Sequence, residues 1–207
     1  DYYEYTQDEH FFQSEIIVYA KDIFMYVETR FPKRKNNKII MEPLNSIETY
    51  WDTRNPITVA AGLISVAKRL LEHKDLCKKE LNYFEEFYMK IPDIPMQEEQ
   101  GEWYLQPAEI LDEVRHNIEI PELYACFPFG IYDIFEDSEK IELMKRTFEK
   151  RIEEYKCNRP FCIGDNVSYP SYSGWQYQGI VAARLGMKEL AQEILVNNVQ
   201  MKNPGNR

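Results

Sequence analysis

The sequence predicts an all-α fold of helical hairpins, with short strands in the loops. Two observations support this fold class. Apolar residues recur at the spacing of an amphipathic helix in several separate segments. Long segments rich in Pro, Gly and polar residues separate these helices, and long loops in a compact domain are usually functional. Hairpins with elaborate loops on one side favour an α/α toroid or solenoid. The sequence shows no fixed-period repeat of the tetratricopeptide or ankyrin type.

The first predicted helix follows a capping-box pattern. Thr6 would be its N-cap, and Glu9 stands three positions later. An apolar stripe over residues 12–27 continues the helix. The helix is expected to end near Phe31, because the residue before a proline avoids the helical conformation and Pro32 follows.

The rest of the chain continues this alternation of helices and loops. Asn55 and Pro56 favour a helix start, with Asn55 as N-cap and Pro56 at the first helical position. Gly186 is expected to end another helix. The expected later helices are 56–71, 77–89, 122–127, 138–155, 175–185 and 188–198, with short strands at 38–41 and 103–105 and a long irregular loop at 156–174.

Charge and hydropathy exclude two classes of partner. The 207 residues carry 25 basic and 35 acidic side chains, a net charge of -10. An acidic surface disfavours nucleic acid and anionic membranes, because binding to phosphate requires clustered Lys and Arg. No apolar run reaches the roughly 20 residues that a membrane helix needs. A signal peptide and an initiating Met are both absent from the sequence, so the true N-terminus is expected to precede Asp1.

The four cysteines predict neither a metal site nor a cofactor site. Cys157 and Cys162 are too far apart for a CxxC pair, and no nearby His completes a ligand set. Buried free thiols are expected for all four, including Cys77 and Cys126. A Cys157–Cys162 loop disulfide is the alternative if the protein is secreted.

The strongest candidate for chemistry is the segment 48–55. Glu48 and Asp52 supply two carboxylates, Trp51 an indole and Asn55 an amide within eight residues. A carboxylic acid can protonate a glycosidic oxygen, an indole can stack on the apolar face of a sugar, and amides bind hydroxyls. The alternative is that the aromatic residues belong to the core and the carboxylates favour the start of the next helix.

Two further clusters are candidates for sugar binding. The first contains His116, Glu122 and Tyr124, and the second contains Trp175 and Gln178. A lone histidine is more often structural than catalytic. Trp175 follows a glycine that permits a tight turn, so it could equally cover the core.

These clusters, in this order, resemble segments of six-hairpin glycosidases related to glycoside hydrolase family 95, the α-L-fucosidase type, many of them from gut Bacteroidetes. The similarity covers almost the whole chain, and its longest motif, at 117–129, is fairly specific. The matching segments are 6–11 (TQDEHF), 42–56 (EPLNSIETYWDTRNP), 105–109 (LQPAE), 117–129 (NIEIPELYACFPF), Gly174-Trp175 and 182–186 (AARLG).

The resemblance implies a glycoside hydrolase whose (α/α)6 toroid carries the site at one mouth. It makes Glu48 the general acid, since residues 46–48 align with the segment that carries the acid in family 95. Trp51, Asp52, Asn55, His116, Glu122, Tyr124, Trp175 and Gln178 would then bind the substrate. The resemblance also favours a secreted or periplasmic protein. No metal or cofactor is implied.

Two departures from the family limit this prediction. Gln178 stands where relatives carry a carboxylate, and the second catalytic carboxylate has no counterpart in this chain. About six helices are expected, whereas a complete toroid has twelve, so residues 1–207 would form part of a catalytic domain. Exposed apolar helix faces would then need a partner, either the remainder of the same polypeptide or a second copy.

The sequence therefore leaves alternatives open. The first is a glycoside hydrolase acting on an oligo- or polysaccharide by acid/base hydrolysis. The second is a non-catalytic carbohydrate-binding or scaffold piece of a larger protein. A toroidal sugar isomerase is a weaker third reading, because it would need paired histidines and the chain contains three His in all.

Overall fold

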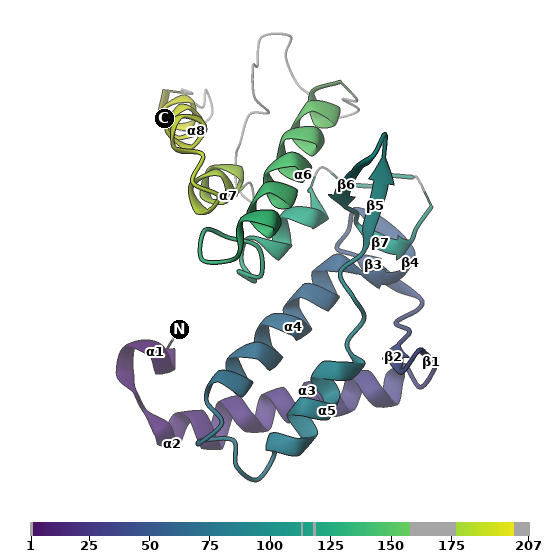
Figure 1. Cartoon of the computed structure of the whole chain (residues 1–207), viewed down its shortest axis with the longest axis vertical. Helices are drawn as coiled ribbons and strands as arrows, with labels where there is room; N and C mark the ends of the chain where they lie inside the picture. The colour runs from purple at the N-terminus through teal and green to yellow at the C-terminus, as the bar shows by residue number, and fades with distance from the viewer. Residues whose placement is uncertain (1, 113, 118, 158–176, 201–207) are drawn as a thin grey trace, which may run out of the picture.

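The computed structural model describes residues 2–112, 114–117, 119–157 and 177–200. Within these residues, helices combine with three small antiparallel sheets (Figure 1). The predicted all-α fold, a partial (α/α)6 toroid spanning residues 1–207, is therefore wrong. Most of the expected helices are present, but strands occupy much of the segments 34–56 and 96–110.

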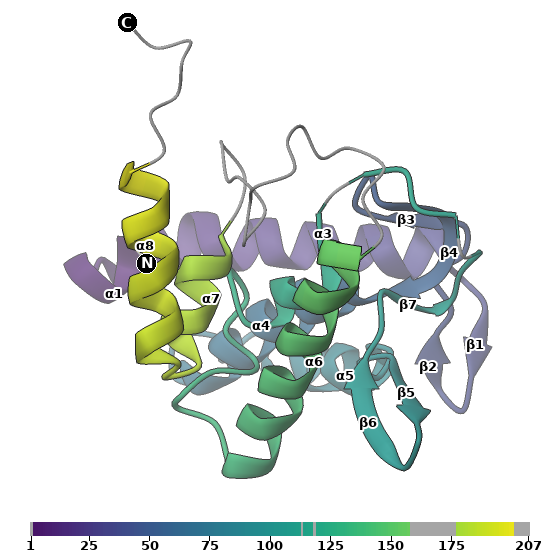
Figure 2. The ribbon, with the colours of Figure 1, turned by 90° about the horizontal axis from the view of Figure 1, so that it is seen from above.

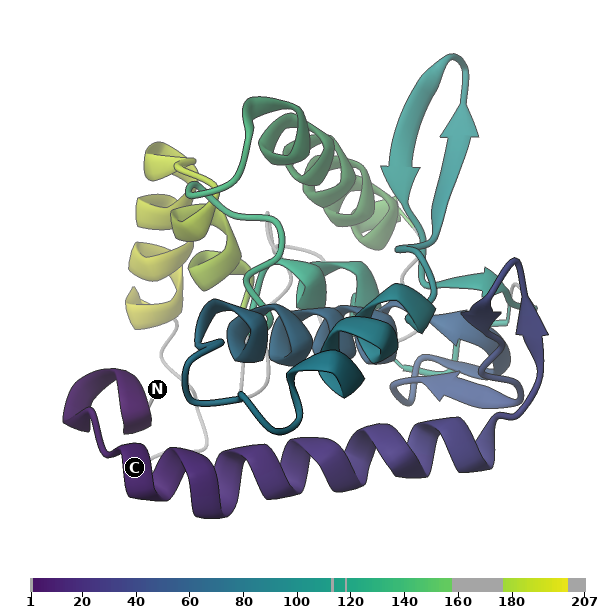
Figure 3. The ribbon, with the colours of Figure 1, turned by 60° about the horizontal axis from the view of Figure 1, so that its bottom comes forward.

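The first packed unit combines the N-terminal helices with two later ones. Its elements are α1 (Tyr2–Thr6), α2 (Glu9–Phe11), the π-helical turn η1 (Phe12–Ile16), α3 (Ile17–Arg30), α4 (Ile57–Glu72) and α5 (Leu81–Lys90). Figure 3 shows α3 along one edge of the molecule, with α4 and α5 on one side of it. The Phe24 ring of α3 stacks on Phe87 of α5, with 4.0 Å between ring centroids, so the inner face of α3 belongs to the core.

The second packed unit lies on the other side of α4. Its elements are the 3-10 helix η2 (Pro121–Ala125), α6 (Ser138–Cys157), α7 (Gln178–Arg184) and α8 (Lys188–Gln200). Leu123, Met144 and Phe148 are fully or almost fully buried at its centre. Gly186 adopts a φ of +71° between α7 and α8, and this confirms its predicted role at the end of a helix.

Helix α4 is shared by the two units. Ala60, Leu63 and Leu70 belong to the first cluster of buried side chains, whereas Ile57 and Ala61 belong to the second. An ordinary surface helix buries one stripe, but α4 buries two. The small side chains of this helix allow the elements on both sides to approach closely.

The strands gather at one end of the molecule, and α7 and α8 lie at the other end (Figure 2). Strand β4 is the centre of the three-stranded sheet and pairs antiparallel with both β3 and β7, in the order β3-β4-β7. The other two sheets are the hairpins β1-β2 and β5-β6. The strands are β1 (Arg34–Lys35), β2 (Lys38–Ile39), β3 (Leu44–Ser46), β4 (Tyr50–Pro56), β5 (Met96–Glu99), β6 (Glu102–Leu105) and β7 (Ala108–Ile110).

Two predicted helix starts are displaced. Asn55 and Pro56 end strand β4, and α4 begins at Ile57 without a side-chain cap. Thr6 ends α1, and the N-cap of the following helix is Asp8, whose Oδ1 accepts a hydrogen bond from the Phe11 amide at 2.9 Å. In both places the helix starts one or two residues later than the local pattern predicts.

The described part of the chain has no helix long and apolar enough to cross a membrane. Cys77 and Cys126 are buried free thiols, which confirms the prediction for these two residues. Burial raises the pKa of the Cys77 thiol to about 11. The predictions for Cys157 and Cys162 concern side chains that the structure does not describe. The loop expected at 156–174 lies outside the described residues from position 158 onward.

Candidate functional site

The predicted site residue Trp51 stands at the surface of the three-stranded sheet. Its indole stacks on the imidazole of His116, with 3.8 Å between ring centroids and 7° between ring planes. Trp51 nevertheless keeps 49% of its surface exposed. The structure thus brings together two residues that are 65 positions apart, and they form a flat aromatic surface open to solvent.

Glu48 lies beside this aromatic pair. The Trp51 Nε1 donates a hydrogen bond to the Glu48 carbonyl at 3.1 Å, which fixes the indole across the β3–β4 turn. The Asn117 Nδ2 donates to the Glu48 Oε2 at 3.1 Å. Glu48 is exposed, so its carboxylate is open to solvent, whereas Asn117 is half-buried.

Backbone hydrogen bonds hold the two segments of this surface together. The His116 amide donates to the Thr49 carbonyl at 2.9 Å, and the Thr49 hydroxyl donates to the Glu119 carbonyl at 3.2 Å. The Arg115 guanidinium donates to the carbonyls of Asn117 and Glu119, which shapes the turn that presents His116. These hydrogen bonds therefore hold the segment that carries Trp51 and the segment that carries His116 in fixed positions.

Asp52 is exposed next to Trp51, in the left-handed backbone region with φ +50°. Its amide donates to the Asn45 Oδ1 at 3.2 Å. Asx side chains tolerate this conformation better than most residues. Asp52 is thus an exposed carboxylate one residue from Trp51, and its role in substrate binding stays a prediction.

Asn55 has a different environment. It is 4% exposed, its Oδ1 accepts from the Met41 amide at 2.8 Å, and its Nδ2 donates to the Glu109 Oε2 at 2.5 Å. These bonds connect β4 to the chain before β3 and to β7. Both ends of the amide are thus engaged in structural contacts away from Trp51.

Glu122 is also buried, at 2% exposure. Its Oε1 accepts from the Arg151 Nε at 2.6 Å, and the same guanidinium donates to Glu154 and to the Leu105 carbonyl. Burial raises the pKa of the Glu122 carboxyl, and the Arg151 charge opposes that rise. This pair connects η2 to α6, so Glu122 is placed as a structural anchor.

Tyr124 and Gln178 belong to the packing between η2 and α7. The Tyr124 hydroxyl donates to the Glu119 Oε1 at 2.9 Å. Burial is the main cause and this hydrogen bond the second cause that raise the pKa of Tyr124 to about 12. Its ring meets Tyr177 edge-on at 5.2 Å between centroids. Gln178 is buried, whereas Trp175 lies outside the described residues.

Tyr50 and Trp51, neighbours on β4, have different surroundings. Trp51 faces solvent with His116, whereas Tyr50 lies near Glu122 and Arg151. Tyr50 helps to line a polar cavity of about 450 Å³. Gln97, Gln106, Glu109 and Arg151 also line this cavity. Of these lining residues, Tyr50 belongs to the sequence motif at 42–56, and Gln106 and Glu109 belong to the motif at 105–109.

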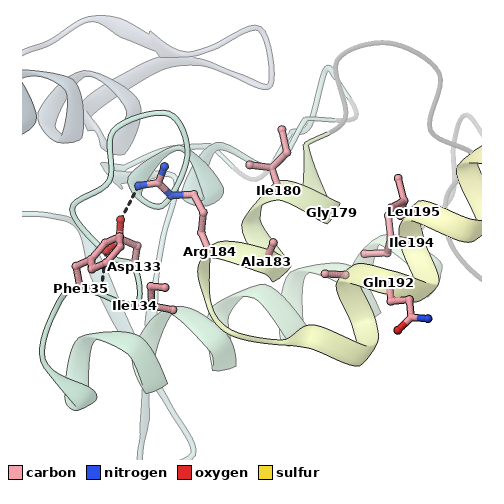
Figure 4. A pocket seen from close by; sticks show the side chains of 11 residues that line it. Asp133, Ile134, Phe135, Gly179, Ile180, Ala183, Arg184, Gln192, Ile194 and Leu195 are labelled. Carbon is pink, nitrogen blue, oxygen red and sulfur yellow. Dashed lines mark hydrogen bonds and ion pairs between the residues drawn. The ribbon is translucent and has the colours of Figure 1, made fainter. Parts of the chain in front are cut away.

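A more apolar cavity of about 710 Å³ lies between α7, α8 and the segment 133–135 (Figure 4). The Arg184 NH2 and Asp133 Oδ2 form an ion pair at 2.5 Å at one end of it. Ile180, Leu195 and the exposed Phe135 provide apolar wall. None of the predicted site residues that the structure describes lines this cavity.

Comparisons with protein-family models, with curated proteins and with solved structures found no match. Among the described residues, no group of three or more His, Cys, Asp or Glu side chains could hold a metal ion.

Proposed function

We propose that this protein binds carbohydrate on the surface formed by Trp51, His116, Glu48, Asn117 and Asp52, called the Trp51 surface below. The observation that carries the proposal is the exposed indole, held flat against His116 with a carboxylate and an amide at its edge. An aromatic face covers the apolar C–H groups of a sugar ring, while the polar groups at its edge bind the hydroxyls.

The exposure of this surface favours binding over catalysis. A general acid in a glycosidase usually works in a site that excludes water and faces a second carboxylate across the scissile bond. Glu48 is exposed, and the buried carboxylate of Glu122 is committed to Arg151. A non-catalytic carbohydrate-binding role is therefore the first candidate.

The test of binding is a Trp51→Ala variant titrated with a panel of soluble oligo- and polysaccharides by calorimetry or affinity electrophoresis. We expect the affinity to fall by about tenfold or more, because removal of a stacked Trp typically costs about 2 kcal/mol. Trp103→Ala is the matched control, since Trp103 on β6 is also 49% exposed. Equal affinities of the wild type and Trp51→Ala would falsify the proposal.

Glycoside hydrolysis with Glu48 as general acid is the second candidate. The Trp51 Nε1 bond to the Glu48 main-chain carbonyl favours it, because it holds the indole against the residue that carries the carboxyl. The resemblance to relatives of family 95 supports the same residue. Asp52, four positions later, is the carboxylate of this surface that could act on water.

Hydrolysis is tested by Glu48→Gln against aryl glycosides and a panel of glycans. Loss of a general acid is expected to lower turnover by about 10²-fold or more, with sugar affinity largely retained. Glu98→Gln, at an exposed carboxylate of β5, is the control for a generic charge effect. Turnover that is absent from the wild type, or unchanged in Glu48→Gln, excludes this second candidate and leaves binding as the function.

A further inference from the structure

Helix α3 exposes an unusual amount of apolar surface on its outer side. Tyr19, Ile23 and Tyr26 are 65%, 52% and 64% exposed, and they follow one another at spacings of four and three residues. That spacing places them on one face of the helix. Val18 and Met25, at 47% and 51% exposure, extend this apolar surface along its edge.

The opposite side of α3 is fully used within the molecule. Its apolar residues pack on α4 and α5, and two of its charges are also satisfied there. Lys21 pairs with Glu80 at 3.5 Å, and Glu28 accepts from Lys90 at 2.9 Å and from Tyr83 at 3.1 Å. Figure 3 shows that α4 and α5 leave the outer side of α3 uncovered along its length.

The outer side of α3 carries a negative charge in its N-terminal half and a positive charge at its C-terminal end. Asp22 is exposed in the N-terminal half and has no ion pair with any residue that the structure describes. Arg30 is exposed at the C-terminal end, where its guanidinium lies 5.1 Å from the centre of the Phe31 ring. Exposed Lys33 and Arg34 follow, whereas Glu9 lies before the helix.

We propose that this face is the contact between two copies of the chain, packed with their α3 helices antiparallel about a twofold axis at Tyr26. Tyr26 stands four residues from both Asp22 and Arg30. An antiparallel pair therefore brings Asp22 of each copy to Arg30 of the other, and Tyr26 meets its own counterpart. A twofold interface requires such self-complementarity.

Physical chemistry favours this occupant over an unrelated helix. The two ion pairs form in the same arrangement that covers Tyr26 and places Ile23 opposite Thr29 of the other copy, and the antiparallel orientation also opposes the two helix dipoles. Like charges meet in the parallel arrangement, which disfavours it. The face is separate from the Trp51 surface, so each copy retains its proposed sugar site, and the inference is independent of that function.

The test is sedimentation velocity of the full chain over a wide range of concentrations. We expect a reversible monomer–dimer equilibrium in the wild type. Tyr26→Asp should make the protein monomeric at concentrations where the wild type is a dimer, with an unchanged far-UV circular dichroism spectrum. Phe135→Asp is the control, because Phe135 is 87% exposed at the apolar cavity near α7 and α8.

Charge reversal gives the decisive readout. Asp22→Arg and Arg30→Asp should each weaken dimerisation about tenfold or more, since like charges then face each other across the twofold axis. The double variant should restore the dimer, because the reversed charges meet again. A wild type that remains monomeric at all concentrations overturns the proposal and leaves the face for a different protein. Dissociation by Phe135→Asp instead of Tyr26→Asp, or no restoration in the double variant, also overturns it.

Discussion

At the scale of single residues, the same chemical groups serve two different purposes in this protein. The carboxylates of Glu48 and Glu122 are both predicted to face a sugar, yet the first is exposed beside Trp51 and the second is buried against Arg151. The difference arises from partners far away in the sequence. Arg151 lies 29 positions beyond Glu122, and no local pattern predicts that they meet.

Removal of Arg151 provides a residue-scale prediction. Arg151→Met leaves the buried Glu122 carboxylate without its counter-ion, which should lower the free energy of unfolding by about 3–5 kcal/mol at pH 7. Chemical denaturation monitored by circular dichroism measures this loss. Arg146→Met is the control on the same helix, because the Arg146 guanidinium donates to the Trp103 carbonyl and pairs with no carboxylate in the described part of the chain.

The loss in Arg151→Met should also depend on pH. Burial raises the pKa of Glu122 above its unfolded value, so the folded state binds the proton more tightly than the unfolded state. Without Arg151 this difference grows, and the folded state loses stability as the pH rises through the unfolded pKa. The variant should therefore regain stability relative to the wild type between pH 7 and pH 5. A loss that is equal at both pH values would contradict a charged Glu122.

At the scale of elements, the helices are predictable and the central sheet is not. A helix repeats its apolar residues every three to four positions, so α3, α4 and α6 are recognisable from local sequence. Strand β4 lacks a regular alternation, because Asp52 and Asn55 have positive φ and the register shifts within its pairing with β3. Its other partner, β7, lies more than 50 residues away. The sequence therefore predicts Trp51 and Glu48 as site residues, both of which are exposed in the structure, but it misplaces Asn55 as a helix cap.

The displaced start of the N-terminal helix gives an element-scale prediction. Asp8→Ala removes the side chain that accepts from the Phe11 amide, which should lower the free energy of unfolding by about 1 kcal/mol. Thr6→Ala should have a smaller effect, since the Thr6 hydroxyl donates to the Tyr2 carbonyl at an exposed helix end. Thermal unfolding of the two variants measures the difference. A larger loss in Thr6→Ala would support the capping box that the sequence predicts.

At the scale of the whole molecule, α4 connects the two clusters of buried side chains. Leu70 lies in the first cluster and Leu123 in the second, and neither is more than 1% exposed. Because α4 contributes to both clusters, neither should remain folded without the other. The two units are therefore expected to unfold in one cooperative transition.

Leu70→Ala and Leu123→Ala test this cooperativity. Each should destabilise the whole protein by about 2–5 kcal/mol through loss of buried contacts and creation of a cavity. In a Trp175→Phe background, tryptophan fluorescence reports on Trp51 and Trp103 of the strands, and far-UV circular dichroism reports on the helices. The two signals should give coincident denaturation curves in both variants. Two separate transitions, with only one of them shifted by each substitution, would mean that the units are independent.

The double burial of α4 has a consequence for how the sequence can change over time. A helix that packs on one side can accept most replacements on its outer side, and α5, which buries Phe84 and Phe87, has such a side. On α4, Ala60 and Ala61 are adjacent yet belong to different clusters. A Cβ at position 62 would come within 3.1 Å of the Phe129 ring, so Gly62 cannot easily be replaced by a larger residue. Few positions of this helix are therefore free to vary. We expect relatives of this protein to diverge first on the outer side of α5 and last along the row of small residues in α4.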